Sequence, residues 1–447
     1  SMKNSISILN ARIVNEGTIV TGDVIVEHGR IASIGSSTPN QRKGSILDAR
    51  GAWLIPGLID DQVHFREPGF PDKACIRTES MAAVAGGVAA YMEMPNTRPT
   101  TTDQARWQEK MDIGAKDSYA HYGFYLGATN DNLEEIRKAD PKRIPGIKVF
   151  MGSSTGNMRV SDPDILEAVF KASPTLVATH CEDDDIIARN MAVFEQRYGA
   201  DIPAECHPDI RTREACLASS SLAVELARRH NTRLHVLHIT TRDELRLFDS
   251  GPVEAKSITC EACVHHLFFN DKDYATLGHR LKCNPSVKRE SDRQALLQAL
   301  RDDRIDVIAT DHAPHTVSEK NQPYKSAPSG LPLVQHSLPV LLDLVAQGAL
   351  DIQTVVSKTS HAAAKRFGIP QRGYIREGYW ADLVLCAIES PKQEDSKPII
   401  LSKCGWSPFE HYPLRGKVLG TIIDGQLVWD GQRICGKPDV QPLNFAQ

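Results

Sequence analysis

The sequence predicts an α/β fold, in which a TIM (β/α)8 barrel is accompanied by a small β-sandwich domain built from both termini. Through the middle of the chain, apolar strand-like runs alternate with segments of helical periodicity. Both ends carry short β-rich runs punctuated by glycine. Polar residues gather where the middle runs finish, as they do at the carboxyl-terminal face of a barrel. We therefore assign 1–53 and 371–447 to the β-sandwich and 54–370 to the barrel.

The individual elements follow from these patterns. The terminal β-rich runs are 7–14, 23–27, 381–385 and 420–429. The apolar runs of the middle are 53–60, 88–95, 120–128, 146–151, 175–180, 233–239, 257–263 and 305–310, and a segment such as 221–230 has helical spacing. Eight strand–helix units match a TIM barrel. A doubly wound open sheet would give a similar alternation, and the polar residues at the run ends favour the barrel.

Composition excludes several classes of protein. Hydrophobic residues make up 41% and charged residues 24% of the 447 residues, which is ordinary for a globular protein. The net charge of −4, without long blocks of one sign, argues against nucleic-acid or anionic-membrane partners. No apolar stretch has the length of a membrane span or a secretory signal, and the ten cysteines show no disulfide framework. We therefore expect a cytoplasmic protein.

The ends of the middle runs carry side chains that bind metals. In a barrel these ends converge on one mouth, so distant residues become neighbours. Any one of them alone is more often a hydrogen-bonding residue or a helix cap than a ligand. Together they offer the nitrogen and oxygen atoms that zinc prefers. The set consists of His64, Lys148, His180, His238 and Asp311.

Lys148 is the most informative member of this set. Strand alternation places Ile147 and Val149 on one face and Lys148 on the other, so Lys148 points into the barrel if its neighbours pack against the helices. Burial lowers the pKa of an amine toward the neutral form, which can react with carbon dioxide to give a carbamate that bridges two metals. A lysine paired with an interior carboxylate is the alternative, and the residues alone leave both open.

Three motifs carry a resemblance to a known family. They are 56–69 (PGLIDDQVHFREPG), 94–99 (MPNTRP) and 308–316 (IATDHAPHT). With weaker matches such as 373–384, they resemble the amidohydrolase superfamily and, within it, the dihydroorotase family. The last motif separates dihydroorotases from hydantoinases and allantoinases.

The resemblance implies a role for each matching residue. His64, a carboxylated Lys148 and Asp311 would hold one zinc ion, and Lys148, His180 and His238 would hold a second. Arg66, Asn96 and His315 would bind a substrate carboxylate, and Asn284 would make a further substrate contact. The reaction implied is the reversible, zinc-assisted cyclisation of N-carbamoyl-L-aspartate to L-dihydroorotate in pyrimidine biosynthesis, with Asp311 as general base and then general acid. Such a small-molecule enzyme is compatible with a homodimer.

One position departs from the family pattern. The first histidine of its HxH is Gln62 here, and an amide oxygen is a weaker zinc ligand than imidazole. One zinc is therefore firmly expected, while the other site is loosely occupied, completed by water or empty. A second pattern, Cys260-x-x-Cys263 followed by His265 and His266, lacks a matching ligand pair, and we interpret its cysteines as reduced strand residues.

Three functions remain in competition. A hydantoinase or allantoinase is the nearest alternative, and Arg66 and His315 argue against it because those substrates lack the free carboxylate beside the ring. A non-catalytic scaffold with the same fold is the other, and Gln62 raises it. The stretch 323–332, rich in glycine and proline, is a candidate lid.

Overall fold

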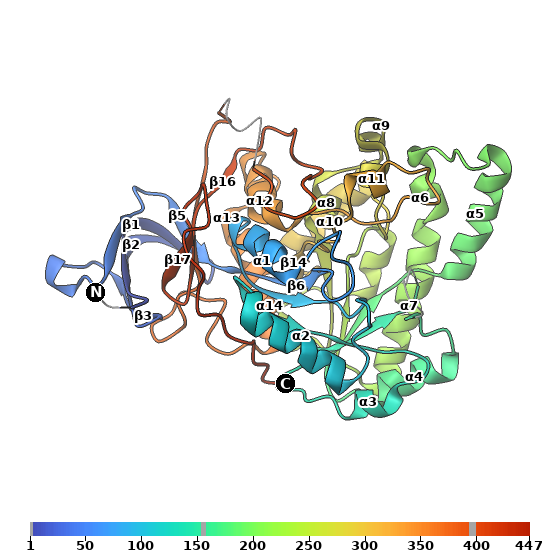
Figure 1. Cartoon of the computed structure of the whole chain (residues 1–447), viewed down its shortest axis with the longest axis horizontal. Coiled ribbons are helices and arrows are strands. Elements are labelled where there is room, and N and C mark those ends of the chain that lie inside the picture. Colours follow the sequence, from blue (N-terminus) through green and yellow to red (C-terminus); the bar gives the residue numbers. More distant parts are fainter. Residues whose placement is uncertain (1–2, 153–157, 393–398) are drawn as a thin grey trace.

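The computed structural model describes residues 3–152, 158–392 and 399–447. Strands from both ends of the chain pair in one sheet, in the order β17-β16-β15-β5-β1-β2-β3, with β4 paired to β1. This sheet lies at one end of the molecule, and long helices lie at the other (Figure 1). Its strands are β1 (Ile6–Asn15), β2 (Thr18–Glu27), β3 (Arg30–Gly35), β4 (Ser45–Asp48), β5 (Trp53–Pro56), β15 (Leu383–Ile388), β16 (Gly416–Ile423) and β17 (Gln426–Trp429).

The middle of the chain forms two parallel sheets. One has the order β6-β7-β8 and the other β14-β13-β12-β11-β10-β9. The edges of the two sheets meet, since His64 N donates to His312 O at 2.7 Å and only Tyr125 separates β8 of the first sheet from β9 of the second. The strands are β6 (Leu58–Val63), β7 (Val88–Glu93), β8 (His121–Phe124), β9 (Leu126–Gly127), β10 (Ile147–Phe150), β11 (Val177–His180), β12 (Leu234–Val236), β13 (Ile258–Cys263) and β14 (Val307–Ala309).

Helices alternate with these parallel strands, as the periodicity predicts. The helix predicted at 221–230 is the second half of α7, whose first turn is capped by the Thr212 hydroxyl and whose end at Asn231 is left-handed. The helices are α1 (Ile76–Ala85), α2 (Gln104–Asp117), α3 (Leu133–Arg137), α4 (Pro163–Ala172), α5 (Asp184–Tyr198), α6 (His207–Ile210), α7 (Arg213–His230), α8 (Val264–Phe268), α9 (Tyr274–Leu277), α10 (Glu290–Arg301), α11 (Val317–Lys320), α12 (Ser337–Ala346), α13 (Ile352–Val356) and α14 (Ala362–Phe367). Within the described residues, none of them has the length and apolar character that crossing a membrane requires.

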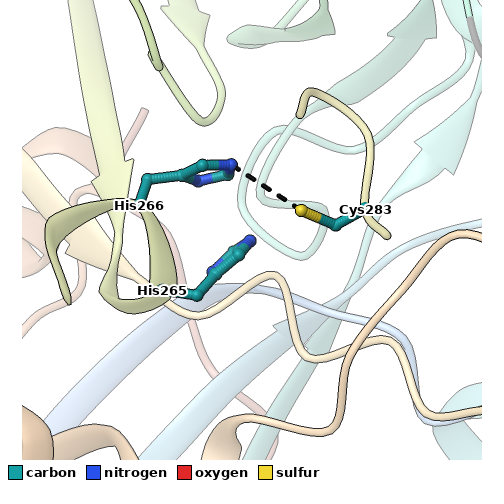
Figure 2. Close-up of side chains that lie close together, drawn as sticks. All are labelled: His265, His266 and Cys283. Carbon is teal, nitrogen blue, oxygen red and sulfur yellow. Dashed lines mark hydrogen bonds between the residues drawn. The ribbon is translucent and has the colours of Figure 1, made fainter. Parts of the chain in front are cut away.

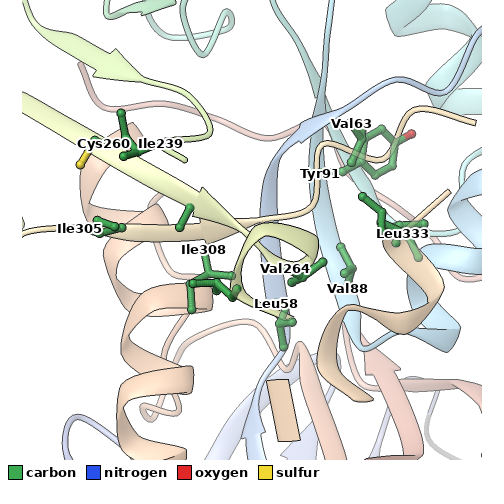
Figure 3. Packing of buried hydrophobic residues seen from close by; sticks show 14 of the residues in the cluster. Leu58, Val63, Val88, Tyr91, Ile239, Cys260, Val264, Ile305, Ile308 and Leu333 are labelled. Atoms are coloured by element: carbon green, nitrogen blue, oxygen red, sulfur yellow. The ribbon is translucent and has the colours of Figure 1, made fainter. Parts of the chain in front are cut away.

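Two apolar clusters lie on opposite faces of the parallel strands. The larger one packs strand residues such as Leu58, Val88 and Ile308 against helices (Figure 3). The smaller one contains Ala178 and Leu237, which point to the other face. Lys148 is the register partner of Ala178, while its neighbours Ile147 and Val149 belong to the larger cluster. The predicted alternation around Lys148 is therefore confirmed.

Three predicted runs each contain two strands, and in 120–128 these are β8 and β9, which belong to different sheets. The run 53–60 contains two strands, because Pro56 and Gly57 end β5 and β6 starts at Leu58 in another sheet. A Cβ at Gly57 would lie 2.5 Å from the Ala89 side chain, so only glycine allows this passage between the sheets. The run 420–429 is likewise divided by a turn at Asp424 and Gly425, where both residues have positive φ.

Candidate active site

His64 and Asp311 form the first part of the site, at the ends of β6 and β14. His64 Nε2 lies 3.1 Å from Asp311 Oδ1, and Gln62 Nε2 donates to the same oxygen at 3.1 Å. On the other side of the imidazole, Nδ1 lies 2.8 Å from Asn96 Oδ1. Asn96, predicted to bind substrate, thus contacts His64 here and fixes the orientation of its ring.

The protonation states of His64 and Asp311 are compatible with a cation bound between them. Burial lowers the pKa of His64 well below its usual value, so the ring is neutral and carries one proton. With that proton on Nδ1 facing the Asn96 oxygen, the lone pair of Nε2 faces the Asp311 carboxylate. Burial also raises the pKa of Asp311 to about 7. A cation between Nε2 and the carboxylate would relieve both the lone-pair repulsion and the cost of burying the charge.

Lys148 lies on the strand face that it shares with Ala178 and is 1% exposed. Burial lowers the pKa of its amine to about 8, while Asp311 opposes this shift. Its Nζ is 4.5 Å from the centre of the Phe150 ring, and that ring stacks on His180. The lowered pKa makes the neutral amine more populated than in an exposed lysine. The neutral amine is the form that the carbamate hypothesis requires.

His180 and His238 form the second part, at the ends of β11 and β12. Their ring centres are 4.5 Å apart. His180 Nε2 lies 2.7 Å from Glu182 Oε1, and Arg211 donates to the same oxygen at 2.9 Å. Burial would raise the pKa of Glu182, but Arg211 and His180 lower it to about 2, so Glu182 is ionised. A carboxylate that holds one nitrogen of a histidine ring in this way orients the other nitrogen, as it does for metal-bound histidines.

Arg66 and His315 meet beside this cluster. Arg66 Nη2 lies 3.1 Å from His315 Nε2, and Arg66 Nε donates to Pro314 O at 3.1 Å. Lys73 Nζ donates to His315 Nδ1 at 2.9 Å and also contacts Glu319. Arg66 is 8% exposed, and burial lowers its pKa to about 10, so the guanidinium remains charged at neutral pH. A buried cation of this kind suits a carboxylate ligand.

Backbone strain marks the same residues. Arg66, His238 and Asp311 have φ values of 66°, 36° and 54°, in the left-handed region that side chains disfavour. Such strain persists only where the surroundings hold it, and it gathers at functional sites.

Asn284 and the candidate lid lie along the adjacent loops. Asn284 is half-buried and precedes a cis peptide bond to Pro285. The segment 323–332 is anchored by two buried lysines: Lys282 Nζ donates to Ala327 O at 2.7 Å, and Lys320 Nζ donates to Pro328 O at 2.8 Å. These bonds describe one position of the segment, and its motion stays a prediction.

The donor set fits a divalent metal ion. His180 and His238 stand beside a lysine with a lowered pKa, burial keeps the pKa of His238 well below its usual value, and His238 Nδ1 is buried without a hydrogen-bond partner in the described part of the chain. His64 and Asp311 offer a nitrogen and a carboxylate. Imidazole and carboxylate are ligands that zinc accepts.

The contacts of three residues in this site were not predicted from the sequence. Glu182 carries a signal, since it lies two residues beyond His180 at the same strand end. Lys73 has none, because its contact with His315 spans 242 positions. The third, Gln62, is recognised as a departure, but its bond to Asp311 depends on the fold.

The comparisons with known proteins identify the family of the chain. A sequence model of the amidohydrolase family matches residues 53–428, and the chain belongs to this family. Two similar relatives are the dihydroorotases of Methanosarcina mazei and Halobacterium salinarum, each 32% identical. The alignments cover 97% and 95% of this chain and 96% and 97% of the relatives.

Solved structures of related enzymes have the same fold. The L-hydantoinase (dihydropyrimidinase) of Arthrobacter aurescens superposes with a TM-score of 0.91 at 25% identity, covering 98% of this chain and 99% of the other. The dihydropyrimidinase of Brevibacillus agri has a TM-score of 0.86 at 21% identity, covering 99% and 100%.

Proposed function

We propose that this protein is a dihydroorotase, which interconverts N-carbamoyl-L-aspartate and L-dihydroorotate in pyrimidine biosynthesis. The observation that carries the proposal is the buried Arg66–His315 pair beside the cluster of metal-ligand side chains. Dihydroorotate carries a carboxylate on the same ring as the amide that reacts, so it needs both an anion site and a metal site. The dihydroorotases of the two archaea are similar over nearly the whole chain.

The cofactor of the proposed enzyme is zinc. Lys148, His180 and His238 would hold one ion, with Lys148 as the carbamate that its neutral amine forms with carbon dioxide, losing a proton. His64, the carbamate and Asp311 would hold a second, where Gln62 stands in place of the usual histidine. When bound, the metal acidifies water and polarises the amide carbonyl.

The protein side chains perform the remaining tasks. Arg66 binds the substrate carboxylate through parallel hydrogen bonds and so orients the ring toward Asp311. In the hydrolytic direction, a carboxylate oxygen of Asp311 accepts the proton of the attacking water and returns it to the ring nitrogen that leaves. Asn96 keeps the His64 ring in place, and Asn284 supplies a further substrate contact. The same steps run backward in biosynthesis.

The proposed fold consists of a barrel and a β-sandwich. We propose that the two parallel sheets close into one (β/α)8 barrel over 54–370, which the bond from His64 to His312 and the continuation of β8 into β9 support. Residues 1–53 and 371–447 would fold over each other as a β-sandwich. An apolar cluster that includes Ile8, Val24 and Leu385 supports this arrangement.

A hydantoinase is the second candidate, because the Arthrobacter aurescens hydantoinase superposes so closely. The decisive experiment measures ring opening of L-dihydroorotate and of hydantoin by protein purified without chelator, with zinc content determined in parallel. We expect dihydroorotate to be the faster substrate. Faster turnover of hydantoin would assign the other activity, and a protein without zinc and without activity would indicate a scaffold.

A further inference from the structure

A second group of metal-ligand side chains lies beyond the proposed catalytic set. His265 and His266 are in α8, directly after β13, and Cys283 is in the loop before α10. Figure 2 shows both imidazoles pointing toward the Cys283 sulfur. The two histidines follow the sequence pattern Cys260-x-x-Cys263, but neither of those cysteines belongs to the group.

The three side chains are close together and closed off from solvent. One ring nitrogen of each histidine and the sulfur lie within 4.8 Å of one another, and Cys283 Sγ is 4.0 Å from His266 Nε2. The exposed fractions are 1% for His265, 3% for His266 and 2% for Cys283. The centres of the two rings are 3.9 Å apart. An ion bound here would take Nδ1 of His266 as its ligand atom, because Nε2 of that ring donates to Pro285 O.

The hydrogen bonding of the group is incomplete. His265 Nδ1 and His266 Nδ1 are buried and have no hydrogen-bond partner within the described ranges. His266 Nε2 lies 3.0 Å from Pro285 O and donates its proton there, which leaves the lone pair on Nδ1. Buried polar atoms without partners are costly, and ligation of a metal is one way to satisfy them.

We propose that His265, His266 and Cys283 form a second zinc site, separate from the catalytic ions. Two imidazoles and one thiolate are ligands that zinc favours over calcium or magnesium. Binding would release the thiol proton of Cys283 to solvent, since the thiolate is the ligand. The ion would tie the end of β13 to the loop that carries Asn284.

Two other groups of similar composition are explained without an ion. His121, Asp382 and Asp424 already surround a cation, because Arg372 Nη1 lies 2.8 Å from His121 Nε2 and 2.7 Å from Asp382 Oδ2. In the group of Asp61, His235 and Glu261, the ring of His235 is engaged at both nitrogens, by Thr259 at 2.8 Å and Glu261 at 2.9 Å. The group at Cys283 contains no such internal cation.

Cobalt spectroscopy on the full chain tests this site without reference to catalysis. Among the described residues, the proposed catalytic ligands include no cysteine, so a thiolate-to-cobalt charge-transfer band would report on Cys283. We expect the band after loading with Co²⁺, its loss in Cys283→Ser, and its retention in Cys386→Ser. Cys386 is a matched control, since it is buried in β15 of the terminal sheet.

The unaltered protein gives a result that does not depend on how the variants fold. If it shows no thiolate band when its other sites are filled with Co²⁺, the second site does not exist. A band that persists in Cys283→Ser would also overturn the proposal. As an independent measurement, zinc content should fall by one ion per chain in His265→Gln and stay unchanged in His279→Gln, whose histidine lies outside the group.

Discussion

Replacing Arg66 with alanine separates substrate recognition from chemistry. The guanidinium is buried, and its neighbours His315 and Pro314 hold it in place. In the complex, Arg66 and the substrate carboxylate would form a buried charge pair, and truncating one partner of such a pair costs about 2–5 kcal/mol. At 1.4 kcal/mol for each factor of ten, kcat/KM for L-dihydroorotate should fall roughly 30- to 4,000-fold. Dihydrouracil has the same ring without the carboxylate, so its slow turnover should change little.

The assay compares both substrates in the unaltered protein and in two variants. Arg98→Ala is the control, because Arg98 is exposed and only packs over the Phe70 ring at 5.1 Å. It should keep the activity on dihydroorotate. An equal loss on both substrates in Arg66→Ala would mean that Arg66 supports the structure and does not recognise the carboxylate. An undiminished kcat/KM for dihydroorotate would refute the anion site altogether.

Further predictions concern metal affinity and stability. Glu182→Gln should weaken zinc binding at the His180 site by about 10- to 100-fold, because Glu182 orients the ring, and competition with a chromophoric chelator measures this; an unchanged affinity would contradict that role. Gln62→His should raise the zinc content of the purified protein, measured by mass spectrometry of the metal, and no increase would argue against an ion beside His64. Arg372→Met should lower the free energy of unfolding in urea by about 3–5 kcal/mol, because it leaves Asp382 and Asp424 buried without their cation. Arg376→Met, which removes an exposed pair with Glu16, should cost at most about 1 kcal/mol. Burial would raise the pKa of Asp382, but Arg372 and His121 hold it well below its usual value. The stability that Asp382 contributes is therefore present above the ordinary pKa of about 4 and lost as the pH falls toward the lower folded value. The difference in unfolding free energy between the unaltered protein and Asp382→Asn should accordingly shrink in acid, and a difference that grows below pH 4 would contradict the sign.

Apolar runs and side-chain alternation in the sequence predicted the strands and the faces on which their side chains lie. Each of the eight apolar runs contains a strand, and alternation correctly placed Lys148 on the strand face opposite Ile147 and Val149. Periodicity gave no signal for the passage from β5 to β6, because both strands are apolar and the break depends on Pro56 and Gly57.

Contacts between distant residues could not be predicted in the same way. The ends of the apolar runs placed His64, His180 and Asp311 at strand ends, and parallel topology brings such ends together. Which atom faces which follows from packing, so the bond from His64 to Asn96 and the contact of Lys73 with His315 appear only in three dimensions. The group at Cys283 is another such case, since its two histidines meet a cysteine 17 or more positions away.

Anomalous diffraction at the zinc edge, on crystals grown without chelator, tests the central claim most directly. The account predicts an anomalous peak among Lys148, His180 and His238, with additional density of a carboxyl group on Lys148 Nζ. Crystals of active protein with no cation between these three side chains would contradict it.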